Sequence, residues 1–362
     1  MAQSLVTKTI GVVTQYNPMG TPSGAMSEAF DCVVRREGIV ENRRGNKVYG
    51  SLSSAPSRVF AYANRVLVLD GATLKYDNGS GTFSSYSGSY SPVSGYKVRS
   101  MLANSNLYFT TDAGVKAVQD INGTVARDAG VPRPLHVELS LSSAGTPSLL
   151  ANSTNVAYRA IFQRTDLNSN VLNSYPSARQ WITNNSGATR DVSVKVYLPS
   201  AIAAGDAVLV YRTTIASGTT DSAGDTGYLC YTATVTSTDV SNKYVSFTDI
   251  VIDALLKNEL YTNATQQGIV QGNSQPPLAR DMALYKSAFA FYANTSTKHQ
   301  LQLTLIGTGS LSGRTITIAG TTYTFDATKD ASIGQVKVFS SGTAAQNIDD
   351  TARCLVEVIN TY

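Results

Sequence analysis

Short runs of alternating apolar and polar residues recur along the chain and predict a protein built mainly of β-strands. One run occurs twice: residues 58–69 read RVFAYANRVLVL, and residues 99–109 read RSMLANSNLYF. In both copies a turn with Asp and Gly follows, and the unit closes on Gly-Thr, at residues 81–82 and 123–124. A repeat of about forty residues with strands joined by tight turns has the length of one four-stranded propeller blade.

A single blade cannot bury its apolar face, so a repeated blade predicts neighbouring blades around a common axis. We therefore expect residues 58–150 to form propeller blades followed by a linker, and the Ser-, Thr- and Ala-rich stretch 137–154 has the composition of that linker. Two unrelated hairpins within an ordinary β-sandwich are the alternative interpretation of the same pattern.

A different pattern begins near Val156. From there to residue 247, short alternating strands are separated by turns, as in a β-sandwich of about a hundred residues. The sequence thus predicts a sandwich inserted at residues 151–265. Residues 281–294 then resemble the start of the earlier repeats, so we expect residues 266–306 to return to the propeller. An ordinary hairpin in a second β domain is the alternative.

Residues 307–362 are predicted to form a small α+β insertion. Residues 314–325 have the pattern of a hairpin, and residues 333–338 that of another strand. After Asn347 the apolar positions fall on one face of a helix, at Ile348, Ala352, Leu355, Val356 and Ile359. Because known propellers use four to eight blades, we expect either a longer product or other chains to close the ring that this chain begins.

Residues 1–57 are expected to form an opening segment that leads into the first blade. Within it, residues 30–45 read FDCVVRREGIVENRRG. This stretch resembles the opening of the tail nozzle and tail-hub proteins of short-tailed bacteriophages, the tail tubular protein B-like family, in which a similar phrase precedes the first propeller blade. Further similarities follow in the family's order: AGVP at residues 129–132, a strand like that of a fibronectin-type module at 208–213, and FTDI at 247–250.

The resemblance implies a mainly β fold in which propeller blades are interrupted by a fibronectin-like β-sandwich and a small C-terminal α+β insertion. It also implies a structural virion protein of the phage tail, assembled in the host cytoplasm. Such a subunit forms a homo-oligomeric ring, commonly a hexamer, next to other tail, portal or adaptor proteins. The ring would line or surround the channel through which double-stranded DNA leaves the capsid, without reading its sequence.

The charge of the chain is compatible with a conduit. Only 15% of the 362 residues are charged and the net charge is +4, whereas a protein that grips duplex DNA presents a dense basic face. The compact basic group Arg43, Arg44 and Lys47 is the candidate for DNA proximity. Solvation of this group, or pairing with Glu37 and Glu41, is the alternative.

Tyrosine is unusually abundant, with 20 residues against one tryptophan. Tyr86, Tyr90 and Tyr96 lie in a Ser- and Gly-rich run. Tyr combined with Ser and Gly makes adaptable protein–protein contact surfaces, so these three residues are the candidate subunit contact. A flexible loop between blades is the alternative.

Groups that would support catalysis are few. Neither of the two histidines, His136 and His299, has a second His or Cys at metal-ligand spacing. No nucleophile elbow, phosphate-binding loop or zinc-protease motif occurs. The carboxylates that could form an acidic pair are Asp70, Asp77, Asp112 and Asp120. Each occupies a turn of the repeat, where Asp is common for geometric reasons, so we expect no enzyme activity, catalytic residue, cofactor or metal.

The chain also lacks signals for secretion or membrane insertion. No apolar run reaches the ~18 residues of a membrane span, and the first residues lack the order of a signal peptide. The three cysteines are odd in number and far apart, which predicts no disulfide framework and favours synthesis in a reducing cytosol.

A carbohydrate-binding or depolymerase-type propeller or sandwich module of a tail fibre is the alternative function. The single Trp181 and the missing acidic pair weigh against it. An extracellular adhesin is disfavoured by the absent secretion signal.

Overall fold

The computed structural model describes residues 11–12, 25–26, 32–34, 40–42, 48–121, 123–143, 148–263, 272–296, 305, 309, 311–318, 320–330, 333–340 and 344–361. The chain divides into two compact units, Met1–Ser51 and Leu52–Tyr362. In the first unit, β1 (Gly11–Val12) pairs in parallel with β2 (Ala25–Met26), and β3 (Cys32–Val34) pairs antiparallel with β4 (Val40–Asn42). The described residues of both units are mainly β, as the alternating pattern predicts.

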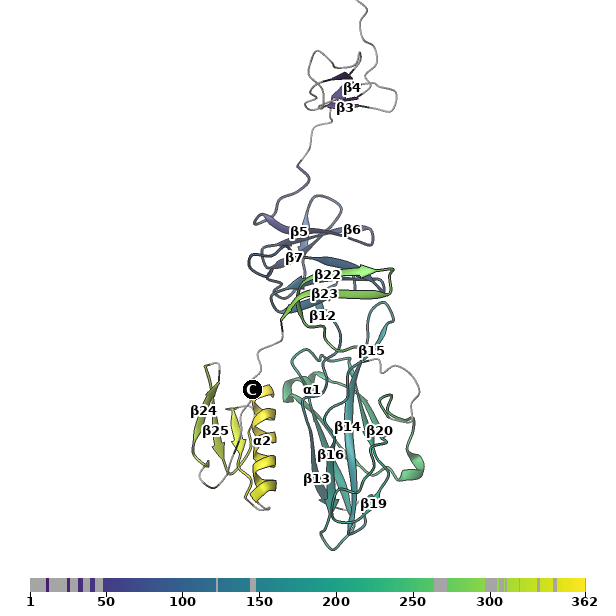
Figure 1. Ribbon diagram of the computed structural model, residues 1–362, viewed down its shortest axis with the longest axis vertical. Helices are drawn as coiled ribbons and strands as arrows, with labels where there is room; N and C mark the ends of the chain where they lie inside the picture. The colour runs from purple at the N-terminus through teal and green to yellow at the C-terminus, as the bar shows by residue number, and fades with distance from the viewer. Residues whose placement is uncertain are drawn as a thin grey trace, which may run out of the picture. The chain divides into compact units, whose positions relative to one another are not determined.

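The repeated sequence forms two successive four-stranded antiparallel sheets (Figure 1). The first meander has the order β5 (Pro56–Tyr62), β6 (Arg65–Asp70), β7 (Thr73–Asp77) and β8 (Phe83–Ser85). The second meander consists of β9 (Ser100–Ala103), β10 (Asn106–Thr111), β11 (Gly114–Val118) and β12 (Arg127–Asp128), again in chain order. Each strand therefore pairs with the next one along the chain; the turns between β5 and β6, β6 and β7, β9 and β10, and β10 and β11 are two residues long, and the last connection of each meander is longer.

The two meanders pack face to face. Side chains alternate between the faces of a strand, and the face of β10 that carries Leu107 and Phe109 shares one buried cluster with Phe60 and Leu67 of the first meander. The rings of Phe60 and Phe109 lie with their centroids 5.5 Å apart. The two copies of the repeat thus bury each other's apolar faces.

The opposite face of the second meander is covered as well. Strands β22 (Leu278–Tyr285) and β23 (Phe289–Ser296) form an antiparallel hairpin, and Met282 of this hairpin packs with Met101, Val115 and Ala129 of the second meander. Residues 278–296 therefore continue the stack begun by the repeat, although about 150 residues separate them from it.

Between Val131 and Gly272 the chain leaves the stack, and the described residues of this region, 131–143, 148–263 and 272, form two further antiparallel sheets around one core. The smaller sheet has the order β13 (Val137–Ser143), β17 (Arg190–Tyr197), β21 (Tyr244–Asp249). The larger sheet contains β15 (Val171–Asn173), β14 (Thr154–Thr165), β18 (Ala207–Arg212) and β20 (Tyr228–Thr234), with β16 (Gln180–Asn184) and β19 (Ala216–Ser217) also paired to β14. Valines of β17 and the alternate residues Val156, Tyr158 and Phe162 of β14 share the buried cluster between the sheets.

Part of the expected linker is a strand. Residues 137–143 pair with β17 along their whole length, from Val137 opposite Val196 to Ser143 opposite Arg190. Their Ser-rich composition indicated a linker, but Val137, Leu139 and Leu141 alternate with polar residues and reach the core. Two short helical turns, α1 (Ser237–Asn242) and η2 (Asp253–Leu255), lie between and after the last strands of this region.

The C-terminal region forms the predicted small α+β unit. Strands β24 (Thr315–Ile318) and β25 (Thr321–Asp326) are a hairpin, and β26 (Gln335–Lys337) pairs in parallel with β25. Helix α2 (Ala344–Thr361) lies along this sheet (Figure 1) and packs Leu355 and Val358 on Phe325 and Val336. The helix and its packing side are as predicted, but not every predicted position: Leu355 and Ile359 pack on the sheet, whereas Val356 is 55% exposed and Val358 is buried in its place.

The chain leaves the stack and returns to it at one place. The backbone N–H of Val131 donates to the carbonyl oxygen of Asn273 at 2.7 Å. Gly130 makes this close approach possible: it has a φ of +76°, and a Cβ built on it would lie 2.4 Å from the carbonyl oxygen of Ser274. Only glycine fits here, because both the conformation and the contact exclude a side chain.

We predict that Gly130→Ala destabilises the protein by several kcal/mol, because the methyl group must push two backbone segments apart as well as adopt a strained φ. Gly187→Ala is the matched control, since Gly187 also has a positive φ, +78°, but nothing lies within 4 Å of its Cβ position. We expect about 1 kcal/mol there. Urea unfolding followed by circular dichroism measures both losses, and equal losses would contradict the contact argument.

Candidate functional site

A cavity of about 530 Å³ lies where β13 of the smaller sheet and β16 of the larger sheet meet the C-terminal α+β region. Its walls come from the start of β13, from β16, from the loop before β26 and from helix α2. The side chains relevant to its chemistry are His136, Glu138, Trp181, Lys329, Lys337, Phe339, Asp350 and Arg353. The cavity thus joins aromatic and charged groups from four segments of the chain, as binding sites commonly do.

One wall of the cavity is a hydrogen-bonded group of charged and aromatic side chains. The ammonium nitrogen of Lys329 lies 3.0 Å from Oε2 of Glu138, and the hydroxyl of Tyr197 donates to the same oxygen at 2.6 Å. Burial opposes ionisation of Glu138, but the Tyr197 hydrogen bond and Lys329 outweigh it and hold the pKa of this carboxyl below its usual value. Glu138 is therefore a carboxylate at neutral pH.

His136 is uncharged at neutral pH. Burial and the neighbouring Lys329 ammonium lower the pKa of His136 to about 4, and its ring stacks on that of Tyr197. The chain therefore keeps one imidazole on this wall as a neutral group that can both donate and accept a hydrogen bond.

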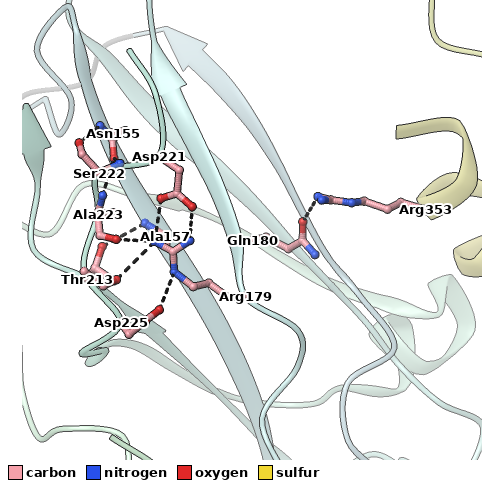
Figure 2. A network of polar contacts seen from close by, with 11 residues as sticks. Asn155, Ala157, Arg179, Gln180, Thr213, Asp221, Ser222, Ala223, Asp225 and Arg353 are labelled. Carbon is pink, nitrogen blue, oxygen red and sulfur yellow. Dashed lines mark hydrogen bonds and ion pairs between the residues drawn. The ribbon is translucent and has the colours of Figure 1, made fainter. Parts of the chain in front are cut away.

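A second link joins the C-terminal helix to the sheet. Nη1 of Arg353 donates to Oε1 of Gln180 at 2.6 Å (Figure 2). The adjacent Arg179 points away from Arg353, toward Asp221 and Asp225 (Figure 2). Its Nη2 lies 2.8 Å from Oδ1 of Asp221, and its Nε 3.3 Å from Oδ1 of Asp225. These contacts of Arg179 connect the loop after β19 to the larger sheet. Gln180 and Arg353 line the cavity, and Arg179 does not.

A buried charge cluster in residues 131–272 was not singled out by the sequence pattern. Arg212 is fully buried, with Nε 3.0 Å from Oδ2 of Asp249 and Nη1 2.8 Å from Oδ1 of Asp253. The hydroxyl of Tyr158 donates to Oδ2 of Asp249 at 2.9 Å. Burial raises the pKa of the Asp249 carboxyl in spite of Arg212. The signal in the sequence was an arginine that ends an otherwise apolar strand, at residues 207–212.

Two of the three candidate contact tyrosines are core residues, which corrects the expectation for them. Tyr86 and Tyr90 are each 2% exposed and belong to the cluster between the meanders. The hydroxyl of Tyr86 donates to the Asp120 carbonyl at 2.7 Å, and that of Tyr90 accepts from the Ala126 N–H at 2.8 Å. Tyr96 is 44% exposed, and Nη1 of Arg280 in the hairpin donates to its hydroxyl at 2.8 Å.

The other site residues predicted from the sequence do not add a second candidate site. Arg43, Arg44 and Lys47 lie outside the described residues. Asp70 is bound by the Lys75 ammonium and by Ser54 and Ser53, which together hold the pKa of its carboxyl well below the usual range. These contacts tie residues 53 and 54 to the first meander.

The described part of the chain contains neither a metal-binding cluster nor a helix that could span a membrane. No group of three or more His, Cys, Asp or Glu residues there is arranged to hold a metal ion. None of its helices combines the length and the apolar character that a bilayer crossing requires. Comparison of the chain with protein-family models, curated proteins and solved structures finds no match.

We predict that Arg212→Met costs about 3–5 kcal/mol of unfolding free energy, because it leaves the buried Asp249 without its cation. Arg179→Met is the matched control at a partly exposed ion pair, where we expect about 1 kcal/mol or less. Chemical denaturation gives both values. Similar losses in the two variants would contradict the assignment of Arg212 as the central cation of residues 131–272.

We also predict that His136 makes the unfolding free energy depend on pH. Its pKa is about 4 in the folded chain and 6.5 when unperturbed, so the unfolded chain binds the extra proton between these values. The stabilisation is complete above pH 6.5 and is lost as the pH falls toward 4, by about 1–3 kcal/mol. Unfolding curves of the wild type and of His136→Gln at pH 7, 6 and 5 measure it; parallel pH profiles would rule it out.

Proposed function

We propose that this chain is a structural subunit of a short phage tail that takes part in a ring around the exit channel for double-stranded DNA. The observation that carries the proposal is the stack formed by the first meander, the second meander and the β22–β23 hairpin. Each layer is antiparallel, each follows chain order, and each packs on the next through alternate side chains. Blades of a propeller are arranged in this way around their axis.

The excursion between the second meander and the hairpin also supports this interpretation. A domain inserted in a loop leaves the flanking layers adjacent in space. Here the exit at Gly130–Val131 and the return at Asn273–Ser274 are hydrogen-bonded to each other, and β22 packs on the layer that the chain left. We interpret residues 131–272 as an inserted fibronectin-like β-sandwich, since their two antiparallel sheets share one core.

The two ends of the stack expose apolar side chains, as expected for layers that need neighbours. On the outer face of the first meander Val59 and Val66 are 55% and 41% exposed. On the hairpin, Phe289 and Phe291 are 61% and 60% exposed and lie on the face opposite Met282. No sheet closes on itself among the described strands. Further blades, or neighbouring subunits of a homo-oligomer, would bury these faces.

A ring around DNA does not need a dense positive lining. Lys and Arg at every phosphate would hold the duplex by counterion release, and the chain carries a net charge of only +4. In this proposal Arg43, Arg44 and Lys47 are the residues nearest to the passing DNA, and Tyr96 is the one candidate contact tyrosine with an exposed ring.

We predict that electron microscopy of the native assembly resolves a ring of these chains with a central hole wide enough for duplex DNA, and with the three layers arranged radially. The double substitution Phe289→Ser and Phe291→Ser should weaken this assembly, because it removes the apolar face that a neighbour covers. Sedimentation of the purified variants measures the change in oligomeric state.

Leu255→Ser is the matched control, since Leu255 is 64% exposed but lies on η2, away from the stack. It should leave the assembly intact. A native assembly in which the three layers share no axis, or a ring unaffected by the Phe substitutions, would overturn the proposed arrangement.

A further inference from the structure

The proposed ring assigns no role to the cavity between β13, β16 and the C-terminal region, and the lining of this cavity has the character of a ligand site. Its volume of about 530 Å³ falls in the range of about 300–1,000 Å³ that small-molecule sites occupy. It is also the place where the only tryptophan of the chain, Trp181, lines a wall, and this side chain is 37% exposed. A partly exposed indole offers a broad apolar face and one N–H donor.

The lining carries an excess of positive charge. Three cations, Lys329, Lys337 and Arg353, face two carboxylates, Glu138 and Asp350. His136 adds no charge at neutral pH, because its pKa is about 4. A ligand with one negative group would therefore balance the lining.

Lys337 is the cation best suited to meet that negative group. Lys329 is paired with Glu138, and Arg353 is held by Gln180. The ammonium nitrogen of Lys337, in contrast, lies 4.7 Å from the ring centroid of Phe339, and no carboxylate of the described residues is within ion-pair distance of it. A half-buried ammonium group in this position attracts an anion.

The same cavity also presents groups that only accept hydrogen bonds. The Glu138 carboxylate accepts from Tyr197 and Lys329 and still has a second oxygen. Carboxylates in a site for anions are tolerated when the ligand brings hydroxyl donors as well as its negative charge. A phosphate ion brings no such donors at neutral pH beyond its single proton, whereas a sugar acid brings several.

We propose that this cavity binds a short acidic saccharide, with a sugar ring against Trp181 and its carboxylate at Lys337. The apolar C–H face of a sugar ring matches the flat indole, the hydroxyls meet the amide and carboxylate groups of the lining, and the carboxylate pairs with the ammonium group. The proposal rests on the cavity alone and stands or falls independently of the ring.

The single tryptophan makes the test direct, because its fluorescence reports on the cavity wall. The full-length chain is titrated with tri-galacturonic acid, and with its methyl ester, which has the same ring shapes without the charges. We expect a saturable change in emission with the acid and binding at least about tenfold weaker with the ester. Calorimetry measures the same two affinities without relying on fluorescence.

Variants locate the site. Lys337→Gln should weaken binding of the acid about tenfold while Lys257→Gln, the same change at an exposed lysine outside the cavity, should leave it unchanged. Trp181→Ala should weaken binding in calorimetry. Circular dichroism of each variant confirms that it is folded.

Three outcomes would overturn the proposal. The first is that neither fluorescence nor heat changes up to millimolar acid, which would mean that no saccharide of this class binds. The second is that the acid and the ester bind equally, which would mean that charge plays no part. The third is that inorganic phosphate or adenosine monophosphate competes as well as the sugar acid, which would mean that the site accepts anions without recognising the saccharide.

Discussion

The arrangement of Leu52–Tyr362 depends on one sheet whose two faces are both apolar. In the second meander Leu107 and Phe109 point to one side, and Met101 and Val115 to the other. Such a sheet is stable only when a layer covers each side, because exposed apolar area costs about 25 cal/mol per Å². The first meander covers one face and the β22–β23 hairpin the other, so a local repeat becomes a stack of three layers.

The return of the chain after residues 131–272 is fixed by contacts that tolerate little change. Gly130 brings the departing strand against Asn273 and Ser274 at backbone distance. The turn between β14 and β15 is hydrogen-bonded to the second meander as well: Asn106 donates to Asp166 at 2.7 Å, and Asn168 donates to the Gln119 carbonyl at 3.0 Å. Polar contacts of this kind depend on direction, and they orient a large insertion without adding apolar surface.

Most of the charged side chains described above have a partner within the protein. Arg212 and Asp249 are buried together, and Arg164 pairs with Asp206 where both side chains are 2% exposed. Such buried pairs carry a desolvation cost, which the attraction between their charges offsets. The cavity lined by Trp181 and Lys337 differs because its charges and its indole face an open volume. Function in a scaffold of this kind lies in its surfaces and cavities more than in its cores.

Local patterns in this chain fix its elements, whereas contacts between distant segments fix how those elements pack. Alternation alone located the strands of the repeat, and the apolar spacing after Asn347 located helix α2. Residues 137–143 also alternate, but their Ser-rich composition pointed to a linker, and only the pairing with β17 about fifty residues later decides that they form a strand. Alternation could not find the cavity, whose walls come from segments near residues 136, 181, 329 and 353.

The tyrosines show the physical reason. Ser and Gly around Tyr86 and Tyr90 indicated a surface loop, because local composition reports only the backbone flexibility and the polarity of a segment. In the structure both rings pack between the meanders, and backbone groups of the second meander form hydrogen bonds with both hydroxyls. The sequence by itself determined the period of the strands and the low charge of the chain. Only the tertiary structure decided which faces are buried, because burial is a property of the partner as much as of the strand.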